Sequence, residues 1–212
     1  MYANSCCNSE DDMDYTSNIG DNIGFVVDNE LDYYKELKPN LYDWISSIDY
    51  SKAIRIKNYD ILMDANSCFL SFNYTLTLEK LYLIDSSNIC HIHGVITDIY
   101  DSLIMGHGKV DDYTMDFELV KGKDKWKYEE PRYIEARISI KKYLGHTRKP
   151  VQKLIKIYND FFTNNCNNDE IYILGFSFED VDLPYIKRVL NDSPCAKVFV
   201  SYYKDEEKKA IW

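Results

Sequence analysis

Two short apolar runs of this chain end in side chains that can do chemistry. The run at 68–72 leads into Asn73, and the run at 89–92 leads into His93. The stretch between them has apolar residues at helical spacing, which predicts a strand-helix-strand unit. Open α/β sheets build their ligand sites at the ends of such strands, so we expect a site at Asn73 and His93.

The histidines of this segment allow a second chemistry. His91 and His93 lie two residues apart, so on a strand their side chains face the same side. Completed by His107 or Asp182, the pair would hold a metal ion that activates water, as in metal-dependent hydrolases. Purely structural interpretations also exist. His91 can be a hydrogen-bonded core residue, His107 part of a turn between two glycines, and Asp182 an acid that complements a helix dipole.

The elements that must position these residues follow from hydrophobic periodicity and from helix breakers. Thr75 is the expected N-cap of the helix after Asn73, although Asn73 could cap that helix itself. Pro39 predicts a break in the N-terminal helical pattern. The expected helices cover 29–37, 40–48, 75–88, 131–144, 150–162, 181–190 and 204–212, and the expected strands cover 68–72, 89–92, 102–105, 171–174 and 196–202.

Strands that read as continuous apolar runs and alternate with helices are typical of a parallel sheet covered on both faces. The predicted fold class is therefore α/β, with a Rossmann-like parallel sheet flanked by helices. A chain of 212 residues is long enough for one domain, which we expect over residues 21–212. An acidic, mobile tail is expected at 1–20, and a Lys-rich helical insertion near 110–165.

Composition excludes several classes of protein. No apolar run approaches the ~20 residues that a membrane span needs, so we expect a soluble protein without a membrane partner. The N-terminus does not resemble a secretory signal, which makes the cytoplasm the expected compartment. The six Cys include no CxxC pair, which argues against a zinc module and a disulfide framework. We expect mostly buried free thiols, with Cys6 and Cys7 exposed.

The net charge of -10 is unevenly distributed. Residues 1–50 carry eleven acids against two Lys, whereas residues 121–156 carry twelve Lys and Arg against four acids. The basic segment could bind phosphate or nucleic acid. The whole chain repels polyanions, however, so we favour a solvated insertion that complements the acidic N-terminus, and we expect no nucleic-acid partner.

Several segments in series resemble the bacterial abortive-infection AbiH family. They are FLSFNYTLTLEKLY, HIHG, MGHGK, TRKPVQKLIKIYNDFF, IYILGFSFEDVDLPYIKRVL and AKVFVSYY, within residues 40–205. The resemblance implies a part in defence against phage, with a phage-derived trigger. It also implies a fold similar to sirtuin-like NAD-binding domains, and thus a nucleotide ligand, NAD, whose N-glycosidic bond the protein would hydrolyse.

The resemblance also implies roles for individual residues. His93, before Gly94, matches the His that acts in sirtuin-like sites as general base, a role suited to an imidazole near neutral pH. Asn73 matches the Asn beside the nicotinamide ribose, and Ser177 matches a turn Ser near the ribose or phosphates. The implied catalytic residues are His93 and Asn73, and the implied ligand-binding residues are Ser71, Thr75, Gly94, His107, Gly175, Ser177 and Asp182.

The chain departs from the family pattern at three places. Thr75 stands where the sirtuin-like motif has a carboxylate, and Phe176 stands where His is frequent in the family. Residues 1–40 show no Gly-rich phosphate-binding turn, so we expect the fold to lack its first Gly-rich strand-turn segment, as in a fragment. The remaining alternative is a non-catalytic nucleotide-sensing or interaction module, or a truncated family member.

Overall fold

The computed structural model describes residues 9–64, 66–97, 103–108 and 131–201. The chain divides into two compact units. Unit 1 comprises Met1–Leu37 with Lys109–Arg148, and unit 2 comprises Lys38–Gly108 with Lys149–Trp212. The expected single domain over 21–212 stays a prediction. All the residues discussed as a site below belong to unit 2.

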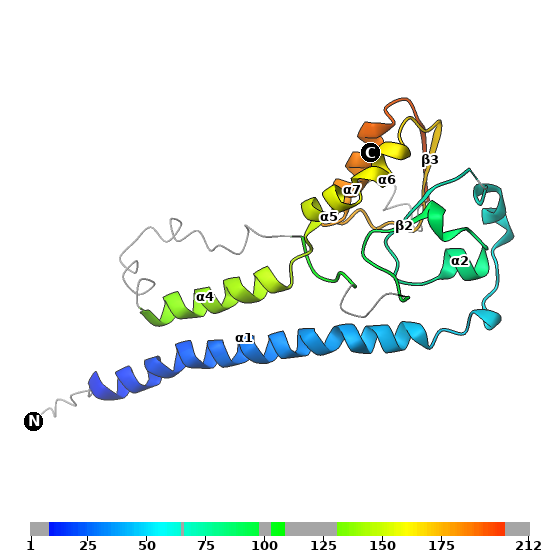
Figure 1. Cartoon of the computed structure of the whole chain (residues 1–212). Coiled ribbons are helices and arrows are strands. Elements are labelled where there is room, and N and C mark those ends of the chain that lie inside the picture. Colours follow the sequence, from blue (N-terminus) through cyan, green and yellow to red (C-terminus); the bar gives the residue numbers. More distant parts are fainter. Residues whose placement is uncertain (1–8, 65, 98–102, 109–130, 202–212) are drawn as a thin grey trace, which may run out of the picture. The chain divides into compact units, whose positions relative to one another are not determined.

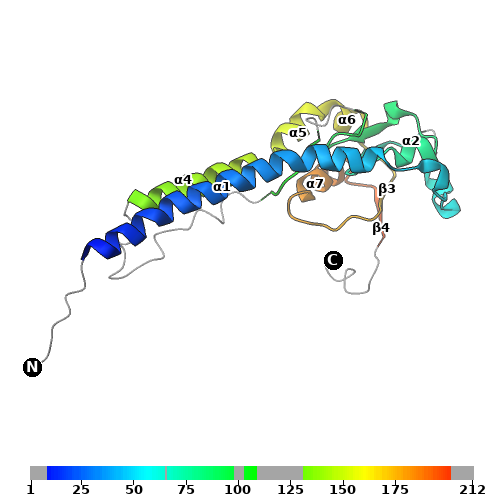
Figure 2. The same cartoon turned by 90° about the horizontal axis from the view of Figure 1, so that it is seen from below.

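The longest element is the helix α1 (Ser9–Ser46), which is drawn without interruption in Figures 1 and 2. The break expected at Pro39 is wrong, because Pro39 lies inside this helix. Pro39 has no N–H to donate to the carbonyl of Lys35, four residues earlier. Lys35 is exposed, so water can hydrogen-bond that carbonyl instead. Residues 9–20, assigned above to an acidic tail, are part of α1, and residues 1–8 lie outside the described residues.

The helix α4 (Pro131–His146) belongs to unit 1, as does most of α1. Val27 and Leu31, one turn apart on α1, are buried, which is the pattern of an amphipathic helix. Lys142 Nζ of α4 lies 3.8 Å from Asp28 Oδ1 of α1, an exposed and therefore weak ion pair. Most of the Lys-rich segment that precedes α4 lies outside the described residues.

The described strands form two parallel pairs in unit 2. β1 (Phe69–Ser71) pairs with β2 (Ile89–His91), and β3 (Glu170–Ile173) pairs with β4 (Lys197–Val200). The register places Ser71 opposite His91 and Ile173 opposite Val200. Each strand is a short apolar run read correctly from the sequence. The α/β class is thereby confirmed at the level of small parallel sheets with helices.

Two of the expected elements differ. The strand predicted at 102–105 is absent over the described residues 103–105, where the N–H of Ile104 donates to the carbonyl of His93 at 2.8 Å. The helix predicted to reach residue 88 ends earlier, since α2 covers only Thr77–Leu81. Leu83 has a φ of 59°, a left-handed conformation that is incompatible with continuing a right-handed helix. Short 3-10 turns occupy Tyr50–Lys52, Lys57–Leu62 and Ser86–Asn88.

Three helices pack on one another in unit 2 (Figure 1): α5 (Val151–Ile157), α6 (Asn159–Asn164) and α7 (Leu183–Asp192). The helix expected over 150–162 is therefore split at Tyr158, whose ψ of 19° departs from helical geometry. The helix predicted at 204–212 and residue 202 of the last predicted strand lie outside the described residues. No described helix is both long enough and apolar enough to cross a membrane.

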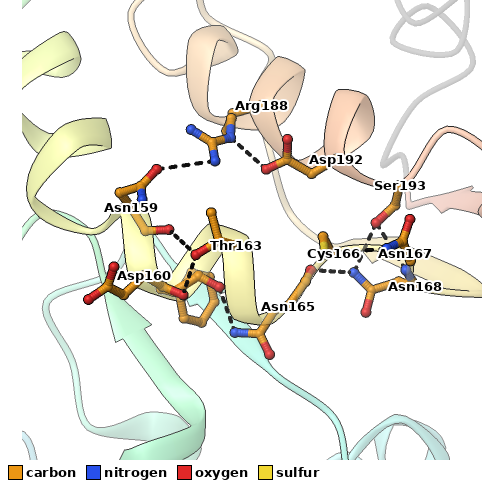
Figure 3. Close-up of polar contacts among 11 residues, drawn as sticks. Asn159, Asp160, Thr163, Asn165, Cys166, Asn167, Asn168, Arg188, Asp192 and Ser193 are labelled. Atoms are coloured by element: carbon orange, nitrogen blue, oxygen red, sulfur yellow. Dashed lines mark hydrogen bonds and ion pairs between the residues drawn. The ribbon is translucent and has the colours of Figure 1, made fainter.

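A polar network fastens the start of α6 to α7, as Figure 3 shows. Arg188 donates to Asp192 one turn later and, at 3.3 Å, to Asn159 Oδ1. The loop between α6 and β3 continues the network. The N–H of Asn167 donates to the carbonyl of Asp192 at 2.9 Å, and that of Asn168 donates to Ser193 Oγ at 3.0 Å. These bonds fix where β3 begins relative to the end of α7.

The apolar core of unit 2 joins β2 to the three packed helices. Its buried members are Cys90, Ile92, Leu154, Phe162 and Tyr185. Burial raises the pKa of the Cys90 thiol to about 12. The expectation of mostly buried cysteines is nevertheless wrong for the described part of the chain, because the other three described thiols, of Cys68, Cys166 and Cys195, are exposed.

Candidate functional site

The parallel pairing of β1 with β2 brings together the residues that follow both strands. The N–H of Ile92 donates to the carbonyl of Ser71 at 3.1 Å, which continues the pairing beyond the end of β2. The rings of Phe72 and His93 then meet edge to face, with centroids 5.5 Å apart. The strand ends therefore meet where the sequence predicts a site.

His93 is the buried polar centre of this region. Its side chain is 2% exposed, and its Nε2 has no hydrogen-bond partner among the described residues. The backbone of Phe72 hydrogen-bonds the imidazole. Because Nε2 has no hydrogen-bond partner among the described residues, we assign this bond to Nδ1. Because a backbone carbonyl accepts, this contact favours the tautomer with the proton on Nδ1. In the neutral ring, Nε2 then carries a lone pair.

The nearest charged groups to that lone pair are an acid and a base. Asp182 Oδ1 lies 3.4 Å from His93 Nε2. Lys149 Nζ lies 3.1 Å from the same Oδ1 and 3.3 Å from Oδ2. Asp182 is the N-cap residue of α7, but its carboxylate makes no cap hydrogen bond and is paired with Lys149 instead.

The surroundings of His93 favour its neutral form. Burial lowers its pKa most, and the positive charge of Lys149 lowers it further. The carboxylate of Asp182 and the hydrogen bond with Phe72 oppose this, yet the pKa still falls to about 4. At neutral pH the imidazole is therefore uncharged, so that a group with an acidic proton can donate to it.

Aromatic rings enclose the imidazole. Tyr185 of α7 packs against His93 with centroids 5.7 Å apart and is itself fully buried. The Phe72 ring also contacts the rings of Tyr185 and Phe176, with centroids 5.7 Å and 5.0 Å away. The Tyr185 hydroxyl has no hydrogen-bond partner among the described residues. Burial, followed by the charge of Asp182, raises its pKa, so it stays protonated.

The predicted turn after β3 contributes Phe176 to the site. Gly175 has a φ of 60°, a conformation that favours glycine, and its N–H donates to Ser201 Oγ at 2.9 Å. Phe178, at the end of the turn, also has a positive φ of 57°. Ser177 is exposed, and no described contact brings it to His93.

The turn after β1 presents Asn73. Its side chain is exposed, while its N–H donates to the buried Ser71 Oγ at 3.3 Å. Asn73 does not cap the following helix, and neither does Thr75, because the N-cap of α2 is Leu76. The Thr75 hydroxyl instead lies 3.0 Å from that of Thr77. Ser71 thus supports the backbone that carries Asn73.

His91 has the structural role that the sequence allows. Its Nε2 lies 2.8 Å from Glu79 Oε1 of α2, and its Nδ1 lies 3.1 Å from the carbonyl oxygen of Asn73. Both ring nitrogens are therefore engaged by acceptors. Gly94, which follows on the same strand end, has a φ of 85°, and its N–H closes a turn onto the His91 carbonyl.

The loop at 103–108 approaches the site through its backbone. The carbonyl of His107 accepts the N–H of Lys149 at 2.8 Å, which holds the chain just before α5. A Cβ added to Gly108 would lie 2.7 Å from the Cα of Val181, so this loop touches the residues that lead into α7. His107 thus helps to place Lys149, and its side chain is only half-buried.

The metal alternative receives no support from this geometry. Within residues 9–64, 66–97, 103–108 and 131–201, no group of three or more His, Cys, Asp or Glu side chains could hold a metal ion. The two nitrogens of His91 already face Glu79 and Asn73, so His91 and His93 do not act as a pair.

The sequence predicts His93 and Asp182 as site residues but does not single out Lys149 and Tyr185, which contact them, or Glu79, which contacts His91. Lys149 is one of many basic residues between 121 and 156, and nothing in its spacing distinguishes it. Tyr185 lies on α7 three residues after Asp182, so the helical period could have placed the two on one face.

A family model covers the part of the chain that contains this site. The family model described as bacteriophage abortive infection AbiH matches residues 3–203, nearly the whole chain. A search of the curated proteins and a search of the solved structures each find no match. The match also covers every residue of the His93 site. The chain therefore belongs to the bacteriophage abortive infection AbiH family.

Proposed function

We propose that this AbiH protein acts in defence against phage by binding an NAD-type nucleotide at the ends of β1 and β2 and hydrolysing its N-glycosidic bond. One observation carries the proposal. The buried His93 has a neutral Nε2, unpartnered among the described residues and 3.4 Å from the Asp182 carboxylate. The finer description of the fold, as Rossmann-like and sirtuin-like, is part of the same proposal.

The chemistry assigns His93 the role of general base. A water oxygen bonds to the anomeric carbon of the ribose while the bond to the nicotinamide nitrogen breaks, and that nitrogen keeps the electron pair. The proton of the water passes to His93 Nε2, and nicotinamide leaves as a neutral molecule. Asp182 stabilises the imidazolium that forms, and the proton then passes to solvent.

The other predicted residues hold the ligand. The exposed Asn73 amide orients the water or a ribose hydroxyl. Ser71 Oγ accepts the backbone N–H of Asn73 and so helps to hold this residue in place. Gly94 and Gly175 let the backbone approach the nucleotide, since both have positive φ angles and neither carries a Cβ. Ligand contacts from Thr75, Ser177 and the His107 side chain complete the proposal.

Nicotinamide release from NAD, followed by chromatography, tests this function. We expect His93→Gln to lose at least about 100-fold in rate, the usual contribution of a general base. Asn73→Ala should also slow release, because the water or ribose loses its orienting amide. The matched control is His146→Gln, since His146 is an exposed histidine at the end of α4 in unit 1.

The control variant should keep the wild-type rate. Equal nicotinamide release from wild type and His93→Gln would overturn the role of His93. Circular dichroism of each variant establishes that it is folded before its rate is compared.

A second candidate function is nucleotide sensing without chemistry. It is favoured by the lowered pKa of His93, because a weak base accepts a proton from water poorly. Under this alternative the protein binds ADP-ribose, as measured by calorimetry, while NAD incubated with it yields no nicotinamide. The same two assays therefore separate hydrolysis from sensing.

A further inference from the structure

Lys149, Asp182 and His93 form a row of three charged or chargeable side chains. Asp182 Oδ1 is the shared atom, 3.1 Å from Lys149 Nζ and 3.4 Å from His93 Nε2. The Lys149 side chain is 11% exposed and the Asp182 side chain 18%. One carboxylate therefore faces both basic groups in a largely desolvated place.

The charges of this row balance only while His93 is neutral. Lys149 contributes one positive charge and Asp182 one negative charge. If His93 accepts a proton, two cations share a single carboxylate away from water, which is unfavourable. The other described groups facing the imidazole are the Phe72 backbone and Tyr185, and neither supplies a negative charge. A second anion is needed to balance a protonated His93.

The backbone of Lys149 is held by hydrogen bonds that do not involve its side chain. The Lys149 N–H donates to the His107 carbonyl, and its own carbonyl accepts from Val151. The ammonium group sits on four flexible methylenes, and lysine binds phosphate as a point charge without demanding a fixed geometry. A phosphate could therefore take up the ammonium while the chain stays in place.

From this arrangement we infer that Lys149 binds a phosphate group of the ligand and, in doing so, releases Asp182 to pair with His93. The inference rests on the proposed function, because it assumes that the nucleotide binds beside His93. It names the ligand class as a nucleoside diphosphate or a pyrophosphate-bearing relative. It also makes His93 a stronger base only when the phosphate is present.

Two measurements with defined probes test the inference. Calorimetry gives the affinities of wild type, Lys149→Gln and Lys153→Gln for ADP-ribose and for inorganic pyrophosphate. Lys153 is an exposed lysine on α5 and serves as the matched control. We expect Lys149→Gln to bind both probes about tenfold more weakly or worse, since it loses a charge-assisted contact, and Lys153→Gln to bind as wild type does.

Proton NMR titration follows the imidazole directly. The chain has four His, so His93→Gln assigns the His93 signal. In wild type, saturating pyrophosphate or ADP-ribose should raise the pKa of His93, whereas adenosine, which has no phosphate, should not. In Lys149→Gln the pKa of His93 should already be higher without ligand, because the charge that lowers it is gone.

Asp182→Asn distinguishes the loss of a phosphate contact in Lys149→Gln from a loss of binding caused by misfolding. It removes the carboxylate that competes for Lys149, so pyrophosphate should bind more tightly than to wild type, an effect that unfolding cannot imitate. The inference is overturned if Lys149→Gln binds both probes with wild-type affinity, if Asp182→Asn binds them no more tightly, or if wild type binds neither.

The outcomes also separate this inference from the proposed function. Nicotinamide release that needs His93, combined with unchanged probe affinity in Lys149→Gln, removes the inference and leaves the function. Pyrophosphate binding that needs Lys149, without any nicotinamide release, leaves the inference and removes the hydrolase.

Discussion

The buried hydroxyl of Tyr185 is expected to lower the free energy of unfolding of the chain. Its ring is fully buried against Phe72 and His93, and its oxygen has no hydrogen-bond partner among the described residues. Tyr185→Phe keeps the ring contacts and removes only that oxygen. A buried hydroxyl without a partner costs ~1–3 kcal/mol, so the variant should be more stable by up to that amount.

The assay is reversible urea unfolding, with thermal unfolding as a second measure. For a chain of this size each kcal/mol corresponds to a shift of ~2–4 °C in Tm. Two controls frame the result. Tyr172→Phe loses an exposed hydroxyl that donates to Glu170 at 2.7 Å, and it should change the free energy of unfolding by less than ~1 kcal/mol in the destabilising direction. Tyr185→Leu loses the ring contacts and should be destabilised by roughly 2–4 kcal/mol.

A Tyr185→Phe variant less stable than wild type by ~1 kcal/mol or more, the usual contribution of a satisfied hydrogen bond, would contradict this expectation. In that case the Tyr185 hydroxyl has a partner in solution, and its oxygen is part of the polar arrangement around Asp182.

Three further predictions concern stability. The pKa of His93 lies at about 4 in the folded chain against 6.5 ordinarily, so the unfolded chain binds more protons between these values. The contribution of neutral His93 to the free energy of unfolding, up to ~3 kcal/mol, is fully present above pH 6.5 and is lost as the pH falls to 4. When the free energy of unfolding by urea is measured against pH, His93→Gln should therefore show a smaller change between pH 6.5 and 4. Leu83→Gly should stabilise by ~0.5–1 kcal/mol in the same assay, because Leu83 is 78% exposed and held at a φ of 59°; a loss of stability would contradict that strain. Gly108→Ala should destabilise by ~1–3 kcal/mol through its clash with Val181, whereas Gly145→Ala, with open space inside α4, should stabilise by up to ~1 kcal/mol; equal effects of the two would count against the loop position.

The local elements could largely be predicted from the sequence because they depend on short-range patterns. The four described strands lie in predicted apolar runs, and Pro184, which suits the first turn of a helix, predicts α7. The errors occur where a tertiary setting overrides a local signal. α1 continues through Pro39, and α2 stops early because Leu83 takes a left-handed conformation that leucine rarely adopts.

The site could be predicted only in part, for a reason of distance along the chain. His93 is found because it follows an apolar strand, and the strand end fixes its place. Lys149 reaches Asp182 across 33 residues, and it has the same local appearance as its basic neighbours. No pattern of spacing carries that information, because the pairing depends on how the start of α5 meets the start of α7.

The reactivity of the Cys90 thiol reports how often the apolar core of unit 2 opens. Its thiol lies inside the core beside Ile92, and with a pKa of about 12 it is scarcely ionised at neutral pH. Cys68, Cys166 and Cys195 are exposed and can be alkylated at once. Alkylation of Cys90 then requires the core to open, so the alkylation rate, measured by mass spectrometry, reports the frequency of those openings. A nucleotide bound at the ends of β1 and β2 should slow the alkylation of Cys90.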